Sequence, residues 1–249
     1  MLRALLGMLL LLLSGVGFGA GFVVQRSEVK SAEYRALAKE LDQSGLLADI
    51  AKELNSLVAL KVTLGLRFAE CGEPNAYYDS ETRQVSVCYE LIESYYETMA
   101  GAYDTEDELD DAVAGAFLFV FFHEIGHALV DVLDVPITGR EEDAVDQLSA
   151  WVLLDGEEGD KAVLDAAISF YAGDEAEQAV DQGSFADEHS LDQQRFYDMI
   201  CWVYGSDPDG YAVLVDEGHL PAERAERCEG EYAQLDRSWT RLLKAHIKP

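Results

Sequence analysis

The feature that most constrains the fold is an apolar run, FLFVFFHEIGHALVDVLD at residues 117–134, which contains two histidines and a glutamate. An apolar stretch of this length predicts a helix buried in the core. His123 and His127 are four residues apart, so their imidazoles project from one face of that helix and can bind one metal ion. Glu124 follows His123 directly, and its carboxylate can reach a water molecule at that metal. The HExxH pattern therefore predicts a buried metal site with a general base.

A zinc site of this kind needs a third protein ligand. The segment GREEDAVDQLSAW at residues 139–151 follows the apolar helix and supplies four acidic candidates: Glu141, Glu142, Asp143 and Asp146. Glu142 and Asp146 are four residues apart and share a helix face. We expect Glu142 to bind the metal and Asp146 to accept a hydrogen bond from a ligating histidine. Asp143 and Asp146 are the alternative ligands, and Glu141 is explained by the preference for acids at a helix start.

A second polar cluster, DEHSLDQQRFY, occupies residues 187–197. Peptide hydrolysis needs hydrogen-bond donors aimed at the oxyanion that develops on the carbonyl. We expect His189 and Arg195 to serve as these donors, with Tyr197 as a weaker candidate. The alternative is an ordinary helix start, with Ser190 as the cap and Arg195 in a surface ion pair.

The hydrophobic periodicity elsewhere predicts a little β-structure followed by many helices, which is an α+β fold. Helical spacing covers residues 28–57, with an interruption at Ser44-Gly45. Alternation predicts strands at residues 60–68 and 84–89. Further helices are predicted at 89–100, 107–134, 140–155, 160–171, 190–204 and 221–243. The segment NAYYDSETRQVSVCYEL at 75–91 predicts either a strand that pairs with an extended peptide or an ordinary hairpin.

The first 24 residues have the layout of a secretory signal: Arg3, a leucine-rich stretch, then small residues. Cleavage after Gly19 would place small residues at both critical positions, Gly17 and Gly19. The alternative is an uncleaved membrane anchor over residues 4–24. Residues 25–249 are predicted to form a single domain, exported to the periplasm or secreted, and the sequence leaves its oligomeric state open.

The chain has four cysteines, with no CxxC pair: Cys71, Cys88, Cys201 and Cys228. Proximity in the sequence favours disulfides between the first two and between the last two, which suits an oxidising compartment. Buried free thiols are the alternative.

The charge excludes other classes of function. With 18 Lys+Arg against 48 Asp+Glu, the net charge is −30, which argues against nucleic acid and anionic membrane surfaces as partners. Membrane contact is expected only through an N-terminal anchor. Apolar residues make up 49% of the chain, enough for a packed core rather than disorder.

Three stretches, HEIGHALVDVLDVP with GREEDAVDQ, EHSLDQQRFYDMICWVYGSDP, and RAERCEGEYAQLDRSW, resemble a bacterial family of zinc metallopeptidases long catalogued as a domain of unknown function. The resemblance covers about residues 50–245. The HExxH-plus-Glu arrangement is similar to the gluzincins, which implies a zincin-like fold, zinc bound by His123, His127 and Glu142, and Glu124 as the base.

We therefore expect a zinc metalloendopeptidase that acts on peptides or proteins. The alternative is a non-catalytic extracytoplasmic zinc-binding or interaction protein, although a structural site would not need Glu124.

Overall fold

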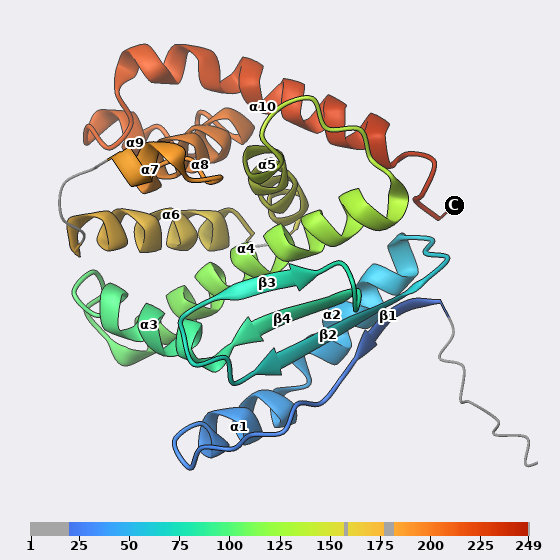
Figure 1. Cartoon of the computed structure of the whole chain (residues 1–249). Helices are drawn as coiled ribbons and strands as arrows, with labels where there is room; N and C mark the ends of the chain where they lie inside the picture. The colour runs from blue at the N-terminus through green and yellow to red at the C-terminus, as the bar shows by residue number, and fades with distance from the viewer. Residues whose placement is uncertain (1–19, 157–158, 177–181, 249) are drawn as a thin grey trace, which may run out of the picture.

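The computed structural model describes residues 20–156, 159–176 and 182–248. Its sheet contains four strands in the order β1-β2-β4-β3 (Figure 1). Strands β1 (Gly21–Val24), β2 (Thr63–Ala69) and β4 (Gln84–Cys88) are parallel, and β3 (Ala76–Asp79) runs antiparallel to β4 at the edge.

Helices make up most of the described chain, which confirms the α+β, mostly helical prediction. Two short helices, α1 (Arg35–Ser44) and α2 (Leu46–Leu57), precede β2, and α3 (Tyr89–Met99) follows β4 directly. The remaining helices are α4 (Glu106–Leu133), α5 (Glu141–Leu154), α6 (Gly159–Ala176), α7 (Gln182–Ala186), α8 (Asp192–Ser206), α9 (Val213–Asp216) and α10 (Ala222–Leu243). Figure 1 shows α5 to α10 gathered on the far side of α4 from the sheet.

The sheet has one buried face. Leu64, Leu66, Val85 and Val87 alternate along β2 and β4 and are almost fully buried. Helix α2 packs mainly on β1, and α4 packs on β3 and β4. The opposite face carries polar contacts such as the hydrogen bond from Arg67 to Ser86 (2.9 Å).

Helix α4 is the central element of the core. A capping box fixes its start, because Thr105 and Glu108 exchange side-chain-to-backbone hydrogen bonds, and acids fill its first turn. Its length and apolar composition would suit a membrane span, yet 67% of its most apolar 18-residue stretch is buried within the described fold. The buried helix predicted around HExxH is thus α4, and it ends at Asp134 in the left-handed conformation.

A glycine lets α4 and α5 approach closely. A Cβ atom on Gly126 would lie 2.8 Å from the Cβ of Val145 and 3.1 Å from a methyl group of Leu148. Ser149 of α5 also donates a hydrogen bond of 2.6 Å to the carbonyl of Phe119 on α4. Because Gly126 lies between the two histidine turns, this contact brings the start of α5 against the HExxH motif.

The N-terminal part differs from the prediction in two places. The helix expected from residue 28 begins at Arg35, because the backbone N–H groups of Lys30 and Ser31 donate to the carboxylate of Glu70 (2.8 and 3.0 Å) and hold an extended segment there. The predicted break is confirmed, with Gly45 at φ +73° between α1 and α2. The last residues of the apolar N-terminal segment form β1, and residues 1–19 lie outside the described part.

Two disulfides join the four cysteines, and they are the two favoured by proximity. Cys71 bonds to Cys88, which ties the approach to β3 to the end of β4. Cys201 bonds to Cys228 and ties α8 to α10. Disulfides form in oxidising compartments, so the pairing supports an extracytoplasmic location.

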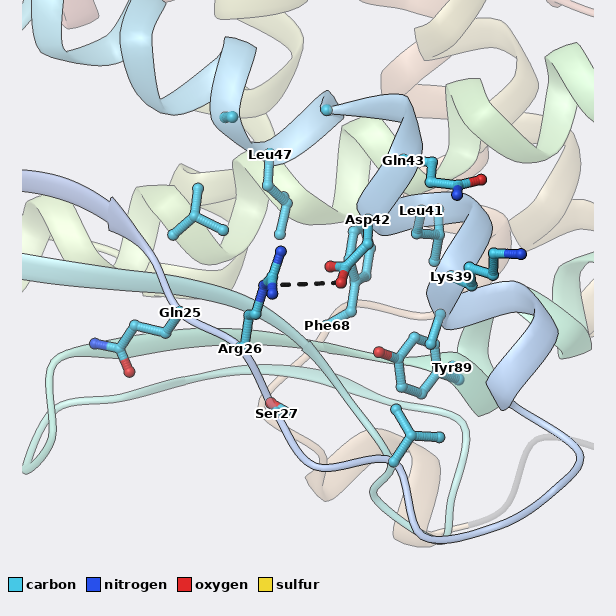
Figure 2. Close-up of a pocket in the computed structure, with 15 residues that line it drawn as sticks. Gln25, Arg26, Ser27, Lys39, Leu41, Asp42, Gln43, Leu47, Phe68 and Tyr89 are labelled. Carbon is cyan, nitrogen blue, oxygen red and sulfur yellow. Dashed lines mark ion pairs between the residues drawn. The ribbon is translucent and has the colours of Figure 1, made fainter.

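A cavity of about 590 Å³ lies between the α1–α2 hairpin and the segment that follows β1 (Figure 2). Arg26 faces Asp42 across it at 3.8 Å, and both side chains are largely exposed. Its described lining shares no residue with the cleft that holds the HExxH motif.

Candidate metal centre

The HExxH histidines and one carboxylate of α5 converge on a single point. The Nε2 atoms of His123 and His127 lie 3.1 and 3.2 Å from Oε2 of Glu142, and 3.3 Å from each other. One ligand atom from each of these three residues lies within 4.8 Å of the others. The structure therefore brings together the three residues predicted as ligands.

The donor set fits a catalytic zinc site. Two imidazole nitrogens and one carboxylate oxygen are a known three-ligand combination for catalytic zinc, which leaves one coordination position for water or substrate. His123 is 3% exposed, so the site lies at the base of the cleft rather than on the surface. The convergence of these atoms identifies the residues that would hold the metal.

His123 is held from behind by a buried ion pair. Its Nδ1 atom lies 2.7 Å from Oδ1 of Asp146, as expected for the residue that orients a ligating histidine. Arg195 donates two hydrogen bonds to the same carboxylate, from Nε (2.8 Å) and from Nη2 (2.7 Å). The guanidinium also lies 3.9 Å from the ring centre of Phe170. Burial would raise the pKa of Asp146, but Arg195 and His123 lower it to about 2, so the carboxylate stays ionised.

The oxyanion-donor role expected for Arg195 stays a prediction. In the structure Arg195 lines the cleft, two of its donor nitrogens are engaged with Asp146, and its side chain is 11% exposed. The sequence could not show this, because the contact joins α8 to α5 across 49 residues.

His127 has a different carboxylate behind it. Its Nδ1 atom lies 2.8 Å from Oε1 of Glu141, whose side chain is 46% exposed. The sequence reading explained Glu141 by the helix dipole alone and missed this contact. Asp143, the rival ligand, instead accepts a hydrogen bond of 2.6 Å from Ser190. Three of the four acids in this stretch thus contact the HExxH histidines, and Asp143 does not.

Glu124 is buried beside the ligands, with 7% of its surface exposed. Burial raises its pKa, while His123 and His127 act in the opposite direction. The backbone N–H of Tyr78 in β3 also lowers the pKa of Glu124. This neighbour, which the sequence did not reveal, belongs to the edge strand that packs on the HExxH helix.

Strand β3 presents backbone groups to the cleft. The Cys88 N–H donates to the Asn75 carbonyl (3.0 Å), so in an antiparallel ladder the N–H and C=O groups of Ala76 and Tyr78 point away from β4. The Tyr78 hydroxyl also donates to Asp131 of α4 (2.6 Å). Strands β3 and β4 thus form the antiparallel hairpin that was one of the two alternatives, β3 lies against the HExxH helix, and pairing with a peptide stays a prediction.

His189 reaches the ligand cluster from the opposite side. Its Nε2 atom lies 3.1 Å from the same Oε2 atom of Glu142, and its Nδ1 atom lies 3.1 Å from Asp187. It is not one of the three residues whose ligand atoms lie mutually within 4.8 Å. Tyr197 is absent from the described lining of the cleft, whereas His189 is part of it.

The cleft above these residues has a volume of about 980 Å³. Its walls come from β3, α3, α4, the start of α5, α6 and the start of α8. The cleft therefore brings together residues from the sheet edge and from five helices.

Comparison with known proteins supports this centre. A family model described as “Putative metallopeptidase” matches residues 27–243, which include every residue of the ligand cluster. The comparisons with curated proteins and with solved structures gave no match.

Proposed function

The chain belongs to the metallopeptidase family whose model it matches over residues 27–243, and from this premise we propose that it is a zinc-dependent endopeptidase. His123, His127 and Glu142 hold the zinc ion in this proposal. The observation that carries it is the convergence of two imidazoles and a carboxylate beside a buried glutamate. A bound zinc ion would supply a Lewis acid that polarises the scissile carbonyl and makes water more acidic.

The remaining chemistry belongs to the side chains. Glu124 takes the proton of the attacking water and delivers it to the leaving nitrogen. His189, held by Asp187, donates from Nε2 to the oxyanion. Arg195 and Asp146 keep His123 in a fixed orientation and tautomer, so Arg195 is a positioning residue in this mechanism.

The substrate is a peptide in an extended conformation. The outward N–H and C=O groups of β3 provide the partners that such a peptide needs to add to a sheet edge. Because several carboxylates line the cleft, basic or unfolded segments suit it better than acidic ones.

Replacement of Glu124 by Gln tests this function. The side chain keeps its size but loses the ability to accept a proton, so zinc content should be unchanged and cleavage of a panel of denatured proteins should fall about 10²–10⁴-fold. The matched control is Glu97→Gln, which removes an acid from α3 outside the cleft.

Equal cleavage by the Glu124→Gln variant and the parent would contradict the assignment of the base. A zinc-loaded parent that cleaves no member of the panel would favour the alternative, a non-catalytic zinc-binding protein.

The proposed location is outside the cytoplasm. We propose that residues 1–19 are removed as a secretory signal, because cleavage after Gly19 leaves β1 complete from Gly21. An anchor over residues 4–24 would instead have to share residues with that strand. N-terminal sequencing of the exported protein should begin at Ala20, and a chain that retains residue 1 would contradict the proposal.

A further inference from the structure

Tyr95 of α3 is a polar group in the cleft that the proposed mechanism leaves unused. The residue is 9% exposed and lines the cleft. Among the residues that the structure describes, no side chain or backbone group hydrogen-bonds its hydroxyl, and the hydroxyl is not sealed from the cleft. The group is therefore available to a ligand.

The other hydroxyls on this face of α3 are already satisfied. Leu91, Ser94, Tyr95 and Thr98 follow helical spacing, and all four line the cleft. Ser94 donates to the carbonyl of Leu91, and Thr98 donates to the carbonyl of Ser94, both at 2.8 Å. Among these hydroxyls, that of Tyr95 is the one whose donor is not already used within the described fold.

Helices α4 and α6 both pack against α3 and contribute further lining residues to the cleft. These include Val120 from α4 and Ser169 and Phe170 from α6. The hydroxyl of Ser169 donates to the carbonyl of Ala166 (2.7 Å), so it is satisfied as well. Near α3, α4 and α6 the cleft lining thus combines apolar side chains with the open hydroxyl of Tyr95, which is how a selective side-chain pocket is built.

Charged groups of both signs surround the hydroxyl. Burial raises the pKa of Tyr95, Arg195 lowers it, and Asp192 and Glu124 raise it further, so the hydroxyl remains a donor. A ligand with a positive end would approach Arg195, and one with a negative end would approach the two carboxylates. A neutral end avoids both repulsions.

We propose that this part of the cleft, the Tyr95 pocket (Tyr95, Val120 and Phe170), binds a substrate side chain next to the scissile bond and selects one with an apolar stem and a neutral hydrogen-bonding end, such as tyrosine or glutamine. The inference rests on the proposed peptidase function, because it places the pocket beside Glu124 in the same cleft. A site that hydrogen-bonds a substrate hydroxyl discriminates against the analogue that lacks it, because its own polar group is then left unpaired.

The test measures binding of peptides to the zinc-loaded Glu124→Gln variant, which does not require turnover. The probes are alanine-rich peptides that differ at one position, as the pairs Tyr/Phe and Gln/Leu. We expect the polar member of each pair to bind about tenfold more tightly. Adding Tyr95→Phe to this variant should bring both affinity ratios close to one, because it should weaken the binding of only the polar peptide in each pair. Adding Tyr96→Phe, which removes a hydroxyl bonded to Asp110 outside the cleft, should change neither ratio.

Three results would overturn the assignment. The first is no binding of any peptide, and the second is an affinity ratio near one in each pair when Tyr95 is present. The third is an equal loss of affinity for both peptides of a pair when Tyr95 is replaced by Phe. The last result would mean that Tyr95 contacts the peptide backbone. Failure of the peptidase function itself is measured separately, as absence of cleavage by the parent.

A stability measurement excludes a structural role for the hydroxyl. Tyr95→Phe should leave Tm unchanged or raise it, because no hydrogen bond within the described fold is lost. Tyr103→Phe should lower Tm, since the Tyr103 hydroxyl donates to the buried Asp165 (2.8 Å). A decrease of the same size for both variants would overturn the proposal.

Discussion

The two histidines of the HExxH motif lie on one helix, yet the two sides of the metal centre are built differently. Behind His123, the Asp146 side chain is 6% exposed and is held by Arg195. Behind His127, Glu141 is 46% exposed and lies on the cleft rim. The same carboxylate–histidine contact therefore occurs once in the core and once near solvent. Charge interactions strengthen with burial. The Asp146 contact should therefore contribute most to the stability and zinc affinity of the centre, and the Glu141 contact should contribute little.

The largest effect is expected from Asp146→Ala. It removes the orienting partner of His123 and leaves the Arg195 guanidinium buried without its carboxylate. Breaking a buried pair in this way costs about 3–5 kcal/mol of unfolding free energy. Loss of the orienting contact should weaken zinc binding about 10–100-fold. Chemical denaturation of the metal-free protein and competition with a chelator measure the two quantities.

The double variant Asp146→Ala/Arg195→Met is the control for this interpretation. If the penalty comes from an unpaired charge, removal of Arg195 as well should restore part of the stability, because the two substitutions are not additive. A double variant as unstable as the sum of the single variants would contradict the unpaired-charge explanation. It would point instead to lost packing around Phe170.

A smaller effect is expected from Glu141→Gln. Its contact with His127 is exposed to solvent, so the free energy of unfolding should change by less than about 1 kcal/mol. Zinc affinity should fall by less than about tenfold, and the loss should shrink at high ionic strength because salt screens an exposed pair. Asp143→Asn is the matched control from the same helix turn, and it should leave zinc affinity unchanged. If Asp143→Asn abolishes zinc binding, the ligand assignment is wrong. If Glu141→Gln lowers stability and zinc affinity as much as Asp146→Ala does, the proposed difference between the buried and the exposed contact is wrong.

The sequence predicts the parts of the molecule that depend on local spacing. The helix around HExxH, the break at Gly45 and most other helix limits follow from hydrophobic periodicity within single segments. The two disulfides follow from proximity. The position of His189 beside the ligands agrees with its predicted place in the cleft, and its donor role stays a prediction.

The remaining features depend on contacts between segments. Strand β1 was hidden because its residues continue the apolar N-terminal segment, and only pairing with β2 distinguishes them. Arg195 has the same sequence signature whether it faces the substrate or Asp146. Glu141 and Glu142 are adjacent, and the docking of α5 on Gly126 brings Glu142 to the Nε2 atoms of both histidines. The open hydroxyl of Tyr95 becomes evident only when the partners of its neighbours are known.

The two disulfides also affect the order in which the chain is oxidised. Each joins cysteines that are consecutive in the sequence, 17 and 27 residues apart, and the two loops neither overlap nor enclose one another. A chain that enters an oxidising compartment N-terminus first exposes Cys71 and Cys88 together, well before Cys201 emerges. The Cys71–Cys88 bond can therefore form before the other two cysteines emerge. Cys201 and Cys228 then have only each other as partners. Native pairing follows from the order of emergence and does not require later exchange between bonds.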